Sequence, residues 1–165
     1  MSYPRTIRNY NAFLDGISYF GKTSKAKLPA LKIKTAAFRG AGMDAEVAQD
    51  QGMEAFQAEL TFKEFLPEVI KKFGRKERLV LRPAAQGEDD FTADAWVFTL
   101  GGRLTTNEFD DLDPGNQSDM KIMMDVDYYR IEKNGEELVL IDVENGKRVI
   151  GGFDQLADIR AAMGV

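Results

Sequence analysis

The feature that most constrains this chain is the stretch from Leu28 to Leu60, in which two extended arms flank a glycine-containing tip. In the first arm, residues 30–38, side chains alternate between the two faces as they do in a β-strand. The second arm, residues 45–62, alternates too: one face carries Phe56, Ala58, Leu60 and Phe62, and the other carries Gln51, Gln57 and Glu59. Between the arms, Gly40 and Gly42 can adopt positive φ angles, so the chain can reverse direction there. The pattern predicts a long β-hairpin, around residues 30–62.

The length of these arms has a structural consequence. Strands average about five or six residues, whereas an arm of up to about eighteen residues would span on the order of 60 Å, more than the diameter of an ordinary domain of this size. Such an arm must bend or project from its domain. A projecting two-stranded ribbon is marginal in water and leaves its edges unpaired. We therefore expect other copies of the same chain to complete its pairing.

The composition excludes several classes of function. The chain of 165 residues is expected to form a single domain. Its net charge of −5 argues against a nucleic-acid-binding surface. It contains no cysteine and no histidine, which excludes disulfides and removes the commonest general base and metal ligand. No apolar run is long enough for a membrane span or a signal peptide, so we expect folding in the cytoplasm, no membrane anchor and no cofactor.

The first half of the chain contains three further local signals. Residues 1–12 are polar and are expected to form a tail that only neighbours would order. Residues 13–19 predict a compact hairpin around Asp15 and Gly16. Residues 63–74 follow helical spacing, with Pro67 tolerated in the first turn and Gly74 ending the helix.

The second half predicts more strands, separated by acidic loops. A strand begins at residues 79–82 and is checked by Pro83, and another covers residues 96–100 before Gly101 and Gly102. Polar loops with acidic clusters follow each of them, at residues 84–93 and 110–115.

Residues 120–150 predict a three-stranded meander with turns at Asn134-Gly135 and Asn145-Gly146. Alternation within its first strand places one set of side chains on one face, namely Ile122, Met124, Val126 and Tyr128. A final helix is expected over residues 154–163, with Asp154 as its N-cap. Its buried side would consist of Leu156, Ile159 and Met163.

Four groups of residues invite a chemical interpretation. The Gly40-Ala41-Gly42 tip lacks the rest of a phosphate-binding loop, and the acidic loops lack the closing ligand of a calcium loop. Asp125 and Asp127 lie about 7 Å apart on one strand face, a separation suited to paired-carboxylate hydrolysis. Tyr128 and Tyr129 face opposite ways, so only one could stack on a nucleobase. In each case a turn, a solvated loop or a half-buried sheet residue is the simpler interpretation, and no catalytic or metal site is expected.

The order of these motifs resembles one known family. The FLDG hairpin, the LPALKIKTAAFRGAGMDAEVAQDQGMEAFQAEL ribbon, the MKIMMDVDYYRIEKNGEEL strand pair and the closing IDVENGKRVIGGFDQLADIRAAMG segment together resemble the major tail tube protein of contractile-tailed bacteriophages and R-type pyocins. The resemblance covers about two-thirds of the chain, in the same order and at the same spacing, and the RGAGMD…GMEA pairing is its most specific part.

The resemblance implies a mainly β fold: two packed antiparallel sheets with a short flanking helix. It implies that the sheets join across a homo-hexamer into a continuous inner β-barrel, and that the rings stack into a tube inside a contractile sheath. Such a tube would belong to a virion or an extracellular tail-like particle assembled in the host cytoplasm. Its partners would be the sheath, tape-measure, baseplate and tail-terminator proteins, with DNA or effectors passing through the channel without specific binding.

These expectations assign residues to two surfaces. Subunit contacts are expected at the tip, from Arg39, Gly40, Gly42, Met43 and Asp44. The channel lining is expected to be acidic, so that it repels DNA phosphates. Its contributors are expected to be Asp125 and Asp127, or else the face that carries Gln51, Gln57 and Glu59.

Two alternatives come from other classes of protein. A monomeric β-barrel that binds a small ligand would have a closed, aromatic-lined cavity and a concentration-independent size. A hydrolase using Asp125 and Asp127 would lose turnover on Asp125→Asn.

Overall fold

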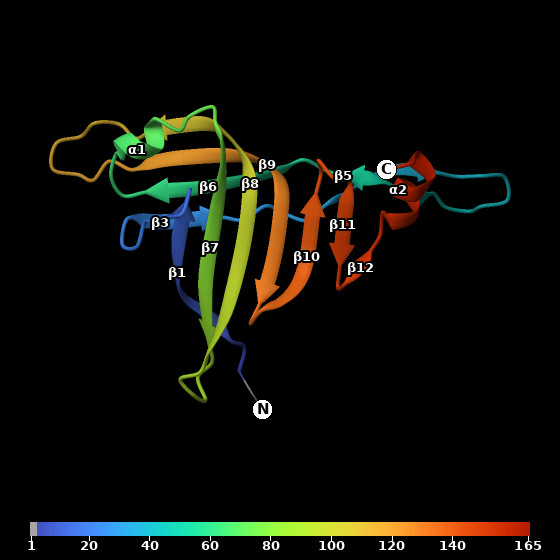
Figure 1. Ribbon diagram of the computed structural model, residues 1–165, viewed down its shortest axis with the longest axis horizontal. Helices are drawn as coiled ribbons and strands as arrows, with labels where there is room; N and C mark the ends of the chain where they lie inside the picture. Colours follow the sequence, from blue (N-terminus) through green and yellow to red (C-terminus); the bar gives the residue numbers. More distant parts are fainter. Residues whose placement is uncertain (1–2) are drawn as a thin grey trace.

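Alternating side chains and glycine turns along most of the chain produce a mainly β molecule (Figure 1), for which a computed structural model describes residues 3–165. Its twelve strands are β1 Thr6–Leu14, β2 Ile17–Ser18, β3 Thr23–Lys27, β4 Ile33–Phe38, β5 Val47–Met53, β6 Phe56–Phe62, β7 Lys76–Gln86, β8 Ala93–Phe109, β9 Met120–Lys133, β10 Glu136–Asp142, β11 Lys147–Ile150 and β12 Phe153–Asp154. Two short helices, α1 Pro67–Ile70 and α2 Ala157–Met163, complete the described part of the chain.

Ten of the strands form one antiparallel sheet, in the order β12-β11-β10-β9-β8-β7-β1-β2, with β6 also pairing with β9 and β3 with β6. Strands β4 and β5 form a separate two-stranded sheet. In Figure 1 the long strands β8 and β9 bend together: β9 pairs with β10 along one half and with β6 along the other, while β8 follows β9 on its opposite side and pairs with β7 over its first part. The predicted mainly β fold with a short flanking helix is confirmed, and its two layers belong to one sheet folded over itself.

The corner of this fold is at Gly101 and Gly102. The sequence predicts a strand end there, but β8 continues through both glycines, and the register opposite β9 shifts because Asp127 is an extra, bulged residue. A Cβ atom on Gly102 would lie 2.0 Å from the Asp125 carbonyl oxygen, so only glycine allows this backbone approach. The bulge also reverses the alternation in β9: Tyr129, not Tyr128, continues the buried face.

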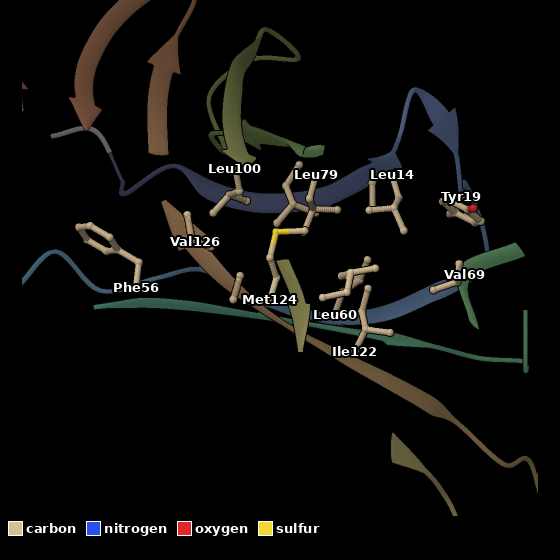
Figure 2. Packing of buried hydrophobic residues seen from close by; sticks show 14 of the residues in the cluster. Leu14, Tyr19, Phe56, Leu60, Val69, Leu79, Leu100, Ile122, Met124 and Val126 are labelled. Carbon is tan, nitrogen blue, oxygen red and sulfur yellow. The ribbon is translucent and has the colours of Figure 1, made fainter. Parts of the chain in front are cut away.

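The core lies between the two layers (Figure 2). Leu14, Leu79 and Leu100 approach it from β1, β7 and β8, and residues of β6 and β9 such as Leu60 and Met124 approach from the other side. The predicted apolar face of β6 is confirmed, because Phe56, Ala58, Leu60 and Phe62 are all buried. Phe56 stacks on Tyr129 at one end of the core, with ring centroids 5.9 Å apart.

Two expectations for β1 and β7 are wrong. The tail predicted over residues 1–12 is, from Thr6 onward, strand β1, which pairs with β7 along its whole length; the first two residues lie outside the described part of the chain. The strand is hidden in the sequence because the outer part of β1 is exposed and therefore polar. Pro83 does not end β7 either: it sits opposite Tyr10 of β1, while the pairing with β8 lapses between Leu81 and Ala84.

The expectations for the turns fare better than those for the helices. Asp15-Gly16 and Asn134-Gly135 both have positive φ at both residues, as the predicted hairpin turns require. Helix α1 covers only Pro67–Ile70 of the predicted 63–74.

Helix α2 departs further from its expectation. Its N-cap residue is Leu156, not Asp154, and none of its residues is buried. Ile159 and Met163, predicted to be buried, are 54% and 63% exposed. Asp154 instead accepts a bond from the Leu156 backbone N–H and pairs with Arg160. Because the helix lies beside the sheet rather than on its core face, its apolar side has no cover within the described residues.

Candidate functional site

The ribbon formed by β4 and β5 is the part of the molecule that most departs from ordinary globular packing. Every residue of β4 is exposed, and so is every residue of β5 except the half-buried Met53. Phe38 lies opposite Val47 on one face, and both side chains are about half exposed, at 48% and 47%. The chain between the two strands extends beyond α2 at one end of the molecule (Figure 1). A pair of strands with no core behind it needs stabilisation from elsewhere.

The ribbon is shorter than the predicted arms. The second arm, predicted to run through residues 45–62, breaks at Glu54 and Ala55, and only β5 belongs to the ribbon, whereas β6 joins the main sheet. The break places Gln51 in the two-stranded sheet and Gln57 in the ten-stranded one, so the two do not share a strand face.

The tip of the ribbon is held by contacts among its own residues. The Arg39 Nε donates to the Met43 carbonyl at 3.0 Å, and the Met43 backbone N–H donates to the Gly40 carbonyl at 3.2 Å. The Gly40 backbone N–H lies 3.1 Å from the Met43 sulfur. Gly42 has φ +86°, so the positive φ expected of the tip is needed there. Asp44 is exposed. The tip therefore presents a defined shape to whatever lies beyond it.

The base of the ribbon is fixed by an ion pair that the sequence did not reveal. Arg148 on β11 is only 7% exposed, and its Nη2 lies 2.7 Å from the Asp50 carboxylate on β5. The Gly52 backbone N–H donates to the same carboxylate at 2.8 Å. The bond from Arg148, together with that from Gly52, lowers the pKa of Asp50 below its ordinary value. Ninety-eight residues separate the two partners, so no local pattern could have paired them.

Three of the residues expected to line a channel do come together. Gln57 on β6 lies directly opposite Asp125 on β9, and Glu59 lies on the same outward face, two residues further along β6. Asp127 lies at the bulge, where its carboxylate is 3.2 Å from the Lys76 Nζ. The expected set is thus divided among a sheet face, a bulge and, for Gln51, the ribbon.

This outward face of β3, β6, β9 and β8 carries charges of both signs. Glu59 pairs with Lys121 at 3.4 Å, Asp125 lies opposite Arg103, and Glu59 lies opposite Lys27. Cations therefore alternate with carboxylates along the face, and it is not the uniformly acidic surface that the sequence suggested. We call it the mixed-charge face, defined by Lys25, Lys27, Gln57, Glu59, Arg103, Lys121 and Asp125.

Two strand edges of the mixed-charge face are open. Within residues 3–165, β3 pairs only with β6, and the end of β8 from residue 105 to Phe109 pairs only with β9. The side-chain oxygens of Ser24 on β3 and Asn107 on β8 are buried without a hydrogen-bond partner in this part of the chain. Buried polar atoms usually have partners, so both edges carry hydrogen-bonding groups that the described part of the chain leaves unpaired.

The same region gives little support for a catalytic or metal-binding site among the described residues. The residues that the structure describes include no group of three or more carboxylates arranged to hold a metal ion. Asp127 is engaged by Lys76, which also contacts Glu144 at 3.1 Å. Neither helix in residues 3–165 is long and apolar enough to cross a membrane.

Comparison with known proteins gives consistent results. The family model described as "Phage tail tube protein FII" matches residues 4–164. The tail tube protein of Escherichia phage P2 is 29% identical over 172 aligned positions, covering 100% of both chains, and the major tail tube protein of Serratia phage KSP20 is 25% identical, covering 88% of this chain and 86% of its own. Among solved structures, a chain of the sheath-tube complex of an extracellular contractile injection system, PVC, in its extended state, aligns with a TM-score of 0.62 at 8% identity, covering 79% of this chain and 92% of that chain.

Proposed function

The chain belongs to the phage tail tube protein FII family, and from this membership we propose that it assembles into hexameric rings that stack into the inner tube of a contractile tail. Residues 4–164, the span that the family model matches, act as a single tail-tube domain with β4 and β5 as its projecting part. The role is structural, and Asp125 and Asp127 have no catalytic part in it.

The observation that carries the ring is the pair of open edges. In the order β3-β6-β9-β8 each strand is antiparallel to the next. The two outer strands, β3 and β8, therefore run in opposite directions. Head-to-tail association therefore brings the β3 edge of one copy antiparallel to the β8 edge of the next. A heterologous contact of this kind closes into a ring when the rotation permits. The closed barrel removes the exposed edges.

The ribbon supports stacking of the rings. It projects at one end of the molecule's long axis, and the loop 110–119 lies at the other end (Figure 1). In a stack the tip residues Arg39, Gly40, Gly42, Met43 and Asp44 would meet the next ring. Since Arg39 already donates to Met43, its part is to shape the tip, and Met43 and Asp44 supply the contacts.

The mixed-charge face would line the channel. Gln57, Glu59 and Asp125 lie on it, whereas Gln51 on the ribbon would line the channel only between rings. Alternating charges leave the phosphates of passing DNA without a continuous basic track to bind. The partners outside this assembly would be a sheath around the tube and terminator, baseplate and tape-measure proteins at its ends and within it.

Electron microscopy of the purified protein at high concentration tests the proposal. We expect rings and tubes from the wild type. Met43→Asp should give a folded monomer that forms no tubes, because a charge then replaces an apolar contact at the tip. Gln155→Asp, which adds the same charge at an exposed position outside the ribbon, should still polymerise.

Two outcomes would contradict the proposal at different levels. Normal tubes from Met43→Asp would show that the tip does not make the contact between rings. A wild-type protein that stays monomeric at every concentration would show that the proposed ring does not form.

A further inference from the structure

An apolar cavity of about 310 Å³ opens on the molecule beside the β3 edge. We call it the edge cavity; among the residues that line it are Ile7, Tyr10, Pro83, Trp96, Phe98 and Leu28. Trp96 and Phe98 stack with ring centroids 6.0 Å apart and form one wall. The cavity is lined almost wholly by apolar side chains, and an apolar surface left open to water is unfavourable.

The position of the edge cavity indicates what covers it. Ala26 on β3 also lines it, so it adjoins the strand edge that is open in the single chain. Any chain that pairs with β3 therefore lies next to this cavity. Under the proposed ring that chain is the β8 edge of a neighbouring copy.

The β8 edge carries an apolar group of its own. Gly74 donates to the Leu104 carbonyl at 2.9 Å, and the Leu104 backbone N–H donates to the Arg75 carbonyl at 3.1 Å, which fixes the segment after α1 against β8. Just before this attachment Ile70 and Phe73 are 37% and 56% exposed. Phe109, 50% exposed, lies at the end of the same edge and packs edge-to-face on Phe65, whereas Phe153 lies on β12 at the opposite end of the strand order.

We propose, resting on the ring described above, that Phe73 and Ile70 of one copy fill the edge cavity of the next. The sizes agree: a cavity of about 150 Å³ accepts a benzene ring, so about 310 Å³ accommodates a phenylalanine ring together with an isoleucine side chain. The contact would bury apolar groups that both copies otherwise expose to water.

Charge favours the same arrangement. Lys71 and Arg75 flank Phe73 and have no ion-pair partner among the described residues. The loop that joins β7 to β8 lies between Pro83 and Trp96 in the sequence, and it carries Glu88, Asp89 and Asp90. Arg8 already pairs with Glu88 and Arg5 lies 4.0 Å from Asp90, so Asp89 is the loop carboxylate left to attract the basic segment around Phe73, and this attraction orients the approach of the two copies.

The absence of cysteine from the sequence makes a direct test possible. Protein carrying only Phe73→Cys is mixed with protein carrying only Ile7→Cys, allowed to assemble, and oxidised. We expect a cross-linked heterodimer as the main product. Phe73→Cys mixed with Phe153→Cys is the matched control and should give no heterodimer.

A second variant measures the contribution of the contact. Phe73→Asp changes an exposed side chain, so the monomer should keep its wild-type thermal unfolding, while the protein concentration needed for ring formation rises at least about tenfold. Phe153→Asp, with the same substitution at a more exposed residue, should leave that concentration unchanged. An apolar dye that fluoresces on binding the monomer should be released on assembly.

The outcomes separate this inference from the ring on which it rests. Rings that form normally from Phe73→Asp, or assembled rings that give no Phe73–Ile7 cross-link, overturn the inference and leave the proposed function standing. Assembled tubes that still bind the dye as the monomer does also overturn it, since the cavity would then be free for a small ligand. A wild-type protein that forms no rings overturns both.

Discussion

Strands β5 and β6 are separated by two residues, yet they are opposite in character. In β6 every second residue is buried, and Leu60 is 1% exposed, whereas in β5 only Met53 is even half-buried. Strand β6 lies between β3 and β9 with the core behind it, while β5 has only β4 beside it. A strand of the body is therefore packed against a core of its own chain, whereas the ribbon has no core behind it.

The boundary between the two regions is well defined. Asp50 and Arg148 hold the ribbon to β11, and the Glu54 backbone N–H donates to the Lys32 carbonyl at 2.8 Å where the two arms leave the body. Beyond these contacts the ribbon is stabilised only by its own pairing and by the contacts at its tip. The direction of the ribbon is therefore set at its base, whereas the rest of its length has no core of the same chain behind it.

Truncating one apolar side chain in each region tests most directly whether the two regions differ in stability. Leu60→Ala should lower the free energy of unfolding of the monomer by about 2–5 kcal/mol, because it leaves a cavity in the core. Phe38→Ala on the ribbon should change it by less than about 0.5 kcal/mol, because Phe38 is half exposed. Denaturant unfolding of both variants measures the difference, and comparable losses would show that the ribbon shares the stability of the body.

The next largest effect is expected at the corner of the body. Gly102→Ala should lower the free energy of unfolding by about 3 kcal/mol, since its Cβ would collide with the Asp125 carbonyl. Gly101→Ala is the matched control: its Cβ would lie 3.3 Å from the Tyr128 Cβ, and the loss should be about 1 kcal/mol or less. Chemical denaturation of both variants measures the two losses in the free energy of unfolding. Equal losses would argue that the bend in β8 does not require glycine at position 102.

The smallest effect is expected at the base of the ribbon. At neutral pH, Asp50→Asn should speed amide exchange in β5 severalfold and leave β6 unchanged, whereas Asp44→Asn at the tip should alter neither strand. Because the pKa of Asp50 is lowered in the folded state, its contribution is present above the ordinary value of 3.8 and is lost as the pH falls through the folded value. The difference in Tm between wild type and Asp50→Asn should therefore narrow below that pH. A difference that persists unchanged in acid would contradict the role given to the ion pair.

Much of the body could be predicted from local patterns. The alternation in β6 predicts its buried face, and the Asn134-Gly135 dipeptide predicts the turn between β9 and β10, because both signals lie within a few consecutive residues. The same patterns failed where composition was misleading: the polar residues of β1 concealed an edge strand, and the apolar spacing of α2 suggested a buried face that the fold leaves exposed.

The candidate site was only partly accessible to the same reasoning. The glycine-containing tip and the shared strand face of Gln57 and Glu59 were anticipated, but the pairing of Gln57 with Asp125 and the cations opposite these strands were not, because facing residues come from strands far apart in the sequence. An acidic lining was inferred from two strands alone, whereas Arg103 and Lys27 on the adjacent strands give the face that carries Glu59 and Asp125 charges of both signs.

Local sequence patterns were enough to establish that the chain is built of strands, where most of its hairpin turns lie, and that Gly42 gives the tip of the ribbon its positive φ, since these are properties of neighbouring residues. Only the tertiary structure decided that Asp127 bulges opposite Gly102, that Arg148 holds Asp50, and that β3 and β8 end as open edges. The physical reason is that register and edge exposure depend on which strands meet. That is settled by the packing of the whole core and not by any segment of it.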